Sequence, residues 1–494
     1  MPKTTVKRVD DTYLGETFFE EKLKQSVVRA REALLALQHP EGYWCFELEA
    51  DCTIPAEYIL MMHYMDEVDE ELQTKIAHYL REHQGNHGGW PLFYGGQFDM
   101  SCSVKVYYAL KMAGDSVNAP HMVKAREAIL AHGGAVRSNV FTRMTLALLP
   151  RWFLFHINKV SYWSRTVMIP LSILCSLKPK AKNPNQVHIH ELFTNPPEEE
   201  KNYFPIRSRL NYLFLQLDKL GRFLEPFIPK GIRRQAVERA EEWFVERLNG
   251  TDGLGAIFPA MVNAHEALAC LDYPPEHPYR VSTKQALKNL LVVNGDSAYC
   301  QPCVSPIWDT GLACLALQEE GSNGVTEEIL RALDWLKNRQ LLDESGDWRQ
   351  NNPDLKGGGW AFQFSNSYYP DLDDTAAVAL ALHQTQQERY QESVQRAANW
   401  ICGMQSKNGG YAAFDSDNSY YYLNEIPFAD HGALLDPPTS DVSARCATLL
   451  SQLGYQGPEL TRCLDFLLKE QEENGSWFGR WGTNNIYGTW SVLT

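Results

Sequence analysis

The sequence predicts an all-α protein built from two α/α-barrel (toroid) domains of stacked helix pairs. Apolar residues recur at helical spacing along most of the chain, and runs with the alternation of a β-strand are nearly absent. Short helices end repeatedly in a Gln, a Gly-containing turn and an aromatic residue. A helix pair of this kind cannot bury its apolar face alone, so neighbouring copies must stack.

Six segments carry the repeated turn, although one of them has lost both the Gln and the aromatic residue. They are Gln38–Trp44, Gln84–Trp90, Leu248–Leu254, Gln340–Trp348, Gln405–Tyr411 and Gln471–Trp477. Weaker copies are expected at 125–134 and 290–299. The Gln side chain can reach the backbone of the following turn, and the Trp ring can lie on the helix end. Each outer helix would then be tied to the next.

Second helices are expected between these turns, at 54–65, 101–113, 305–318, 374–384 and 441–453. Stacked pairs can form an open solenoid, which is typical of binding scaffolds, or a closed barrel with a central cavity. We expect an N-terminal segment over 1–30, a first barrel over 31–300 and a catalytic barrel over 301–494. Residues 178–200, rich in Pro, Lys and Asn, are expected to form a surface loop.

The composition is that of a globular protein with many aromatic residues. The 494 residues include 46 Lys or Arg and 61 Asp or Glu, and the resulting net charge of −15 disfavours binding to nucleic acid. Aromatic residues make up 12% of the chain. Core packing explains most of them, but they also allow a large aromatic-lined cavity.

No stretch of the sequence has the composition of a transmembrane helix or a secretory signal. The longest apolar run, 166–177, is shorter than the ~18 residues that a spanning helix needs and contains Pro170. Charged residues occur throughout the first 30 positions. Without an export signal, the 11 scattered cysteines indicate a reducing cytoplasm. Cys300 and Cys303 have the spacing of half a zinc site, but the second pair is missing, so no metal is expected.

An amphipathic helix is expected within 203–234, a region unlike the repeats. Its apolar residues fall at helical spacing and its flanks are basic, as in helices that lie in a membrane interface. The residues expected to face the membrane are Leu213, Leu217, Leu220, Phe223, Leu224 and Phe227. Packing of this helix against its own domain is the alternative, and the sequence leaves both open.

Three carboxylates within four residues form the sharpest local motif, Pro370-Asp-Leu-Asp-Asp-Thr-Ala376. They fall where a repeat helix begins, so an acidic cap on the helix dipole is one interpretation. The preceding segment, 357–369, is rich in glycine and aromatic residues. Carboxylates in such surroundings are partly desolvated and crowded, so that one proton is retained near neutral pH. A retained proton beside aromatic faces can protonate a carbon base, and the rings can stabilise the resulting cation.

Other chemistry for these carboxylates agrees less well with the sequence. A glycosidase pair would need polar contacts to a sugar. A magnesium-binding cluster for diphosphate chemistry would need a second acidic helix motif, and residues 66–71 are better explained as a solvated face. The chain contains no Gly-rich phosphate loop and no Gly-x-Ser-x-Gly elbow.

Taken together, these motifs resemble the squalene–hopene cyclase family. The resemblance rests on the Gln…Gly-x-Trp turns, on Asp371-Leu-Asp-Asp-Thr-Ala376 and on Ser305-Pro-Ile-Trp-Asp-Thr-Gly311, and it runs from about Thr12 to the end. It implies two α-helical domains, monotopic association with the cytoplasmic face of the membrane, and cyclisation of squalene to a pentacyclic hopanoid without a cofactor. In the related oxidosqualene cyclases the motif typically reads Asp-Cys-Thr-Ala, whereas Asp373-Asp-Thr-Ala376 is of the squalene type.

The resemblance also implies roles for individual residues. Asp373 would donate the proton to the terminal alkene, and Asp371 and Asp374 would flank it and hold the proton. The residues that would support the acid are Arg445, Tyr487 and Asp441. The aromatic residues that would line the substrate or stabilise cations are Trp163, Phe258, Trp308, Phe362, Phe414 and Trp481.

Three of these positions depart from the family's pattern. Arg445 stands where the best-known member has a histidine, and a permanent guanidinium there would hydrogen-bond Asp371 and keep it ionised. Phe414 stands where some members have a tyrosine, and Phe258 replaces a glutamine near the far end of the cavity. These changes leave the initiation step intact. The final step stays open between hopene, hopanol and an incompletely cyclised product.

Two other functions stay open from the sequence. A class II diterpene cyclase uses the same acid motif on a prenyl diphosphate, but it would need a basic pocket that the sequence does not show near the motif. A non-catalytic toroid that binds a prenyl or lipid group would have no reason to place three aspartates beside apolar surface. Whether the protein forms a homodimer is also left open.

The family continues further than Thr494, where this chain stops. We therefore expect a truncated, poorly active cyclase whose C-terminal barrel is incomplete. The expected gap lies beside Tyr487 and opens the cavity to solvent.

Overall fold

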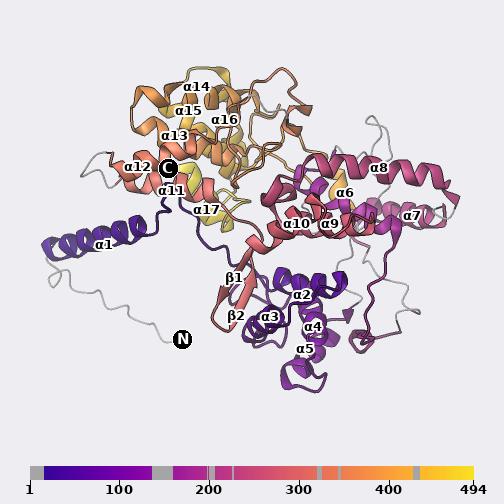
Figure 1. Cartoon of the computed structure of the whole chain (residues 1–494). Coiled ribbons are helices and arrows are strands. Elements are labelled where there is room, and N and C mark those ends of the chain that lie inside the picture. The colour runs from indigo at the N-terminus through magenta and orange to yellow at the C-terminus, as the bar shows by residue number, and fades with distance from the viewer. Residues whose placement is uncertain are drawn as a thin grey trace, which may run out of the picture.

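Over the residues that it describes, the computed structural model consists of helices, connecting loops and one short hairpin, and its helices form two units (Figure 1). It describes residues 16–135, 159–196, 199, 206–224, 227–319, 325–342, 346–426 and 434–494. In Figure 1 helices α11–α17 lie at the upper left, and α2–α10 lie below and to the right. The prediction of an all-α fold of stacked helix pairs is confirmed. None of the described helices is long and apolar enough to cross a membrane.

In the N-terminal unit, inner helices pack against one another and each carries an outer helix. The inner pairs are α2 with α4 and α6 with α9, and the outer helices are α3, α5, α8 and α10. Their bounds are α2 Thr53–Met65, α3 Glu70–Glu82, α4 Met100–Met112, α5 Pro120–Ala131, α6 Tyr162–Leu177, α8 Lys230–Glu246, α9 Phe258–Cys270 and α10 Pro278–Asn289. Helix α6 contains the apolar run around Pro170, and its residues Ile169 and Ile173 are buried as expected.

A β-hairpin closes the N-terminal unit where a weak copy of the repeat was expected. Strand β1 (Leu291–Asn294) pairs antiparallel with β2 (Ser297–Cys300), so the expectation of a repeat turn over 290–299 is wrong. The β-branched Val292 and Val293 favour a strand, and Gly295 takes a φ of 60° in the connecting turn. The repeat-like spacing there comes from a hairpin.

The C-terminal unit has the same two-layer arrangement. Inner helices α11, α13, α15 and α17 follow one another side by side, and outer helices α12, α14 and α16 pack on them. Their bounds are α11 Pro306–Glu319, α12 Glu327–Lys337, α13 Leu372–Gln384, α14 Glu388–Gly403, α15 Ser440–Gln452, α16 Pro458–Glu470 and α17 Asn484–Leu493. Among the outward-facing side chains, Leu464 and Leu468 on α16 and Ile486 on α17 are exposed.

The start of the chain packs on the C-terminal unit. Helix α1 (Glu16–Ala36) leads into a turn in which the Trp44 amide donates to Thr310 Oγ1 at 2.9 Å. The Gln38 side chain donates to the carbonyl of Glu328 in α12 at 3.0 Å. The fully buried Trp44 ring belongs to the C-terminal core.

The repeat turn ties the outer helices together, as predicted. Gln405 Nε2 donates to the carbonyl of Gly409 in its own turn and to that of Glu459 in the next outer helix, both at 2.7 Å. Gln340 does the same with Gly358 and Ser393. The aromatic residue of the Gln340 turn is therefore Trp360, and the pairing of Gln340 with Trp348 is wrong. An insertion between the two halves of the turn places Trp348 elsewhere, in the 3₁₀-helix Asp347–Gln350.

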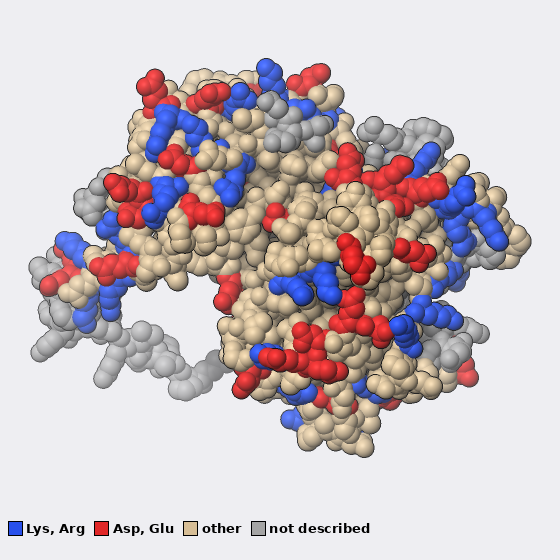
Figure 2. All heavy atoms as spheres, viewed as in Figure 1, with Lys and Arg blue, Asp and Glu red and all other residues tan. Residues whose placement is uncertain are grey.

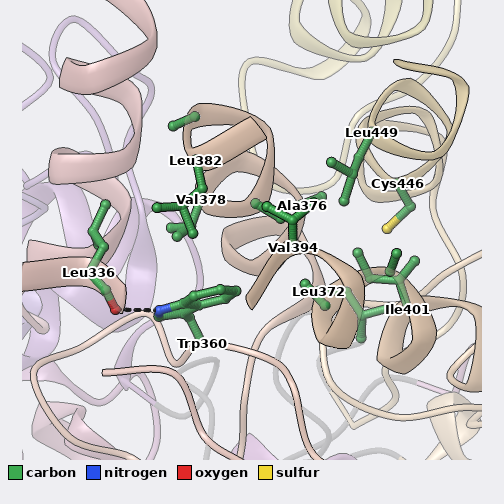
Figure 3. Packing of buried hydrophobic residues seen from close by; sticks show 14 of the residues in the cluster. Leu336, Trp360, Leu372, Ala376, Val378, Leu382, Val394, Ile401, Cys446 and Leu449 are labelled. Carbon is green, nitrogen blue, oxygen red and sulfur yellow. Dashed lines mark hydrogen bonds between the residues drawn. The ribbon is translucent and has the colours of Figure 1, made fainter. Parts of the chain in front are cut away.

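Figure 3 shows how the Trp360 ring fixes the start of α13. Its indole N–H donates to the Leu336 carbonyl at the end of α12 at 2.7 Å, and the ring packs below Val378 (Figure 3). Leu372 and Ala376 on α13 are fully buried in the same cluster. The indole is hydrogen-bonded to α12 and its ring packs against α13. The start of α13 is therefore fixed relative to α12.

Candidate active site

The acid motif forms the N-terminus of the inner helix α13. The Asp371 amide donates to the Trp360 carbonyl at 2.7 Å, and the Leu372 amide donates to the Ala413 carbonyl at 2.8 Å. Asp371 caps the helix, since its Oδ1 accepts the amides of Asp373 and Asp374 at 2.6 and 3.1 Å. The capping interpretation of the motif therefore applies to Asp371. Asp373 and Asp374 do not cap the helix.

Asp373 forms an ion pair with Arg445 on the neighbouring inner helix α15. Arg445 Nε donates to Asp373 Oδ1 at 2.5 Å, and both side chains are nearly buried, with 12% and 11% exposed. The expectation that Arg445 would bind Asp371 is wrong. Asp371 uses Oδ1 for the helix amides, whereas Asp373 lies in the first turn of α13 and faces α15. Within the described chain, Asp373 Oδ2 receives no hydrogen bond.

Burial is the main influence on the pKa values of Asp371, Asp373 and Asp374. It raises the pKa of Asp373 above its ordinary value, and the Arg445 cation opposes that rise. Burial and then the Asp373 charge raise the pKa of Asp371 well above its ordinary value, although two backbone amides oppose them. The pKa of Asp374 is raised well above its ordinary value by burial and by the charges of Asp371 and Asp373. Asp374 Oδ1 is buried and has no hydrogen-bond partner in the part of the chain that the structure describes. The three carboxyl groups therefore hold their protons to a higher pH than a solvated aspartate does, and Asp373 is the one that forms an ion pair with Arg445.

Arg445 is itself held on several sides. Its Nη2 donates to the Tyr487 hydroxyl at 3.0 Å, and its guanidinium carbon lies 5.0 Å from the ring centroid of Trp308 and 5.6 Å from that of Trp490. Burial and then the Asp373 charge raise the pKa of Tyr487 to about 12, so its hydroxyl stays protonated.

Asp441 supports the site in a different way from the one expected. Its Oδ1 accepts the Thr439 hydroxyl at 2.5 Å and the Val442 amide at 3.0 Å, and its Oδ2 accepts the Trp481 amide at 2.8 Å. Asp441 thus holds the segment that carries Trp481, and it makes no hydrogen bond to Asp373 in the described structure.

Several of the predicted aromatic residues meet around Phe414. Its ring centroid lies 5.1 Å from Trp163 and 6.1 Å from Trp481, both edge to face. The buried Asp436 accepts the Phe414 amide at 2.7 Å, which fixes the ring beside the acid motif. Phe362 follows Trp360 by two residues and is half-buried. These rings come from α6 and three loops of the C-terminal unit.

Phe258 lies apart from these aromatic residues. It is fully buried at the start of α9 and stacks on Tyr58 with the ring centroids 6.2 Å apart, in the core of the N-terminal unit. The structure therefore does not bring Phe258 together with the other residues predicted to line the substrate.

A buried polar network beside Phe414 was missed by the sequence analysis. Tyr369 donates to Asp415 Oδ1 at 3.2 Å and accepts a hydrogen bond from Arg165 of α6. Burial raises the pKa of Asp415 to about 6. The position of Asp415 directly after Phe414 could have marked it as a candidate site residue. Its partner Arg165 lies so far away in the sequence that no local pattern predicts the pair.

The amphipathic helix forms as α7 (Arg209–Leu224), and its apolar side chains are exposed. Leu213, Leu217 and Leu220 are 50%, 42% and 52% exposed, and Phe223 is exposed further. Phe227, which lies beyond the end of α7, is exposed as well. The side chain of Leu224 lies outside the described residues. Figure 2 shows Lys and Arg side chains gathered at the right of the molecule, over α7 and α8. Phe214 on the same helix is buried, and Asn211 donates to the Glu425 carbonyl, so α7 packs on the protein through these two residues while the other apolar side chains stay exposed.

Comparison with known proteins identifies the family. The model of the squalene-hopene cyclase N-terminal domain matches residues 27–296, and that of the C-terminal domain matches residues 304–494. Squalene–hopene cyclase of Zymomonas mobilis is 50% identical over 501 residues, which cover 94% of this chain and 76% of that protein. Squalene-hopene cyclase of Schizosaccharomyces japonicus is 50% identical over 513 residues, which cover 98% and 78%.

Among solved structures, abietadiene synthase from Abies grandis aligns with 92% of this chain and 49% of that chain, with 13% identity and a TM-score of 0.42. The family assignment therefore rests on the sequence matches. Fold and acid motif are those of a terpene cyclase built from helix pairs. The chain belongs to the squalene–hopene cyclase family.

Proposed function

We propose that this chain cyclises squalene to a pentacyclic hopanoid, with Asp373 as the proton donor. The observation that supports this most directly is the buried Asp373 carboxyl group, which binds Arg445 through Oδ1 and leaves Oδ2 without a hydrogen bond in the described structure. Relatives that are 50% identical to this chain over the aligned residues are named squalene–hopene cyclases.

The first step transfers the Asp373 proton to the terminal alkene of the polyene. The O–H bond breaks, a C–H bond forms from the π electrons at the alkene carbon that bears hydrogen, and the positive charge is left on the dimethyl-substituted carbon. An alkene is a very weak base, so this step needs to be concerted with ring closure, in which each new C–C σ bond replaces a π bond. Asp373 is left as a carboxylate, and the Arg445 guanidinium stabilises that charge.

The environment of Asp373 combines two opposing requirements. Burial keeps the proton on the carboxyl group before substrate arrives, and Arg445 makes the same group a stronger acid at the moment of transfer. Among the described residues, neither Asp371 nor Asp374 forms an ion pair with a cation. The donor is therefore assigned to Asp373, while Asp371 fixes the helix terminus that positions it.

The moving charge is met by aromatic faces. Trp163 and Trp481 each lie edge to face with Phe414, so Phe414 links the two rings. Aromatic faces attract cations and also exclude water that would trap them early. We assign these three residues, with Phe362, to the wall along which the substrate folds.

The reaction ends when a proton leaves or a water adds to the last cation. Loss of a proton makes the overall change an isomerisation, and addition of water gives an alcohol. Neither outcome changes the oxidation state, so the reaction needs no oxidant or reductant. Product analysis distinguishes hopene, hopanol and incompletely cyclised products.

We further propose that α7 binds the membrane and receives squalene there. Squalene is almost insoluble in water, so direct transfer from a bilayer supplies it best. The apolar side chains of α7 are exposed and flanked by the basic Lys230, Arg233 and Arg234 of α8. An exposed apolar face next to cationic residues favours binding at the surface of an anionic membrane.

The test is incubation of the purified chain with squalene in phosphatidylcholine–phosphatidylglycerol vesicles, followed by gas chromatography–mass spectrometry. We expect cyclic triterpenes from the wild type and a loss of at least about 10³-fold in Asp373→Asn, with the fold unchanged by circular dichroism. Full activity of Asp373→Asn would contradict the assignment of the donor. Geranylgeranyl diphosphate serves as the second substrate, and its conversion in place of squalene would favour a diterpene cyclase.

A further inference from the structure

Arg445 lies between two tryptophan rings, and only one of them, Trp308, was predicted to belong to the site. The guanidinium carbon is 5.0 Å from the Trp308 centroid and 5.6 Å from the Trp490 centroid. We infer that Trp490, together with Trp308, is a positioning residue for the proton donor: the two indoles hold the Arg445 guanidinium against Asp373. This inference rests on the proposed function and deepens it.

Two hydrogen bonds and two ring contacts restrain the guanidinium. Along the edge, Nε donates to Asp373 and Nη2 donates to the Tyr487 hydroxyl. Guanidinium faces stack on aromatic rings while the edges donate hydrogen bonds, so the two kinds of contact are compatible. Removing one ring leaves the hydrogen bonds possible but lets the group rotate around them.

Three inner helices contribute to this arrangement. Trp308 lies in the first turn of α11, Arg445 lies on α15, and Trp490 lies on α17, one turn after Tyr487. The Tyr487 and Trp490 rings are 5.7 Å apart, so α17 presents a hydroxyl group and an indole to the same guanidinium. Helix α17 therefore acts on Asp373 through Arg445, without touching the carboxylate in the described structure.

This geometry changes the role of Trp308. A permanent cation already occupies one side of its ring, and a carbocation arriving there would be repelled by the like charge. Orienting Arg445 is therefore the role that the geometry assigns to Trp308, in place of the predicted stabilisation of carbocations.

The test compares Trp490→Leu and Trp490→Phe with the wild type, using kcat and KM for squalene between pH 5 and 9. The other titratable groups around Asp373 stay unchanged in both variants: Asp309, Asp371, Asp374, Asp441, Cys446 and Tyr487. We expect Trp490→Leu to lower kcat about threefold with little change in KM. A loosened Arg445 stabilises the Asp373 carboxylate less, so the pKa of Asp373 rises. The pH at which kcat falls on the alkaline side should therefore increase by about half a pH unit. Trp490→Phe keeps an aromatic face and should lie in between.

The matched control is a second Arg–Asp pair that carries an aromatic ring. Arg389 pairs with Asp334 at 3.1 Å and lies over Tyr390 at 4.7 Å, on the outer helices α12 and α14. Tyr390→Leu should lower Tm and leave the pH profile of kcat in place. An unmoved alkaline limb in Trp490→Leu, or an equal movement in Tyr390→Leu, would overturn the inference.

A second measurement separates this inference from the proposed function. In protein labelled with ¹⁵N-arginine, the Arg445 Nε–H resonance is assigned by its loss in Arg445→Lys, without any substrate. We expect Trp490→Leu to shift or broaden it and Trp490→Phe to restore it in part. An inactive wild type would contradict the proposed function but leave this readout intact, whereas an unchanged resonance in Trp490→Leu would contradict the positioning role itself.

Discussion

Gln340 donates a hydrogen bond to the carbonyl of Ser393, 53 residues later in the chain, at 2.9 Å. The same side-chain amide also donates to Gly358 at 2.7 Å within its own turn. One glutamine therefore connects two outer helices to the turn that leads into the acid motif. In contrast, Gln471 bonds only the Gly475 carbonyl of its own turn, at 3.0 Å, in the described structure.

This difference gives the first prediction, that Gln340→Ala destabilises the fold more than Gln471→Ala. Gln340→Ala removes two hydrogen bonds and leaves two buried carbonyl groups without a partner, which costs about 2 kcal/mol or more of unfolding free energy. Gln471 is exposed and loses one bond, so its variant should cost less than about 1 kcal/mol. Urea unfolding followed by circular dichroism measures both. Equal losses would contradict the role of the second bond.

The second prediction concerns the permanent charge of Arg445. In Arg445→His the partner of Asp373 is a cation only while the imidazole is protonated. As the pH rises through about 6.5 the imidazole loses its charge, the pKa of Asp373 rises, and kcat falls. The wild-type guanidinium keeps its charge, so this loss is absent there. Arg445→Lys is the control with a retained charge, and kcat profiles that coincide for His and Lys would contradict the prediction.

The third prediction tests α7 as the membrane-binding element. Replacing Leu213, Leu217 and Leu220 with Ser removes apolar side chains that are half exposed, and should weaken binding to anionic vesicles about 100-fold. Vesicle flotation measures the binding. Leu464→Ser with Leu468→Ser, on the exposed face of α16, is the control and should bind like the wild type. Unchanged vesicle binding of the α7 variant would contradict the proposal that α7 is the membrane-binding element.

The fourth prediction uses the buried Asp415, whose pKa is raised to about 6. In the unfolded chain this carboxyl group titrates near its ordinary value, so between about pH 4 and 6 the folded state holds the extra proton. Its contribution to stability is therefore full at low pH and declines as the pH rises through this window. Asn cannot titrate, so Asp415→Asn should gain about 3 kcal/mol relative to the wild type between pH 4 and 7. Thermal unfolding at several pH values checks the sign, and a constant difference in Tm would contradict it.

The sequence predicted the repeat and the acid motif because both are encoded locally. The Gln of each turn and the aromatic residue after it are close in the sequence. Asp371–Asp374 fall where the spacing of apolar residues predicts the start of a helix. Pairings across inserted or distant segments could not be predicted. Trp348 offers the same local pattern as Trp360, and the hydrogen bond from the Trp360 indole to the Leu336 carbonyl identifies Trp360 as the aromatic residue of the turn. Likewise, which aspartate meets Arg445 depends on the rotation of α13 relative to α15.

The start of the chain has a consequence for how the protein is made. The turn at Trp44 finds its partner Thr310 only after 266 further residues have been added. At a synthesis rate of about 5–20 residues per second, the delay is roughly 13 to 53 s. For that time an indole destined for full burial has no core to enter, since the helices that cover it do not yet exist. The C-terminal unit therefore assembles from both ends of the described chain, and its N-terminal helix has to be kept from aggregating until the ribosome has made α11 and α12.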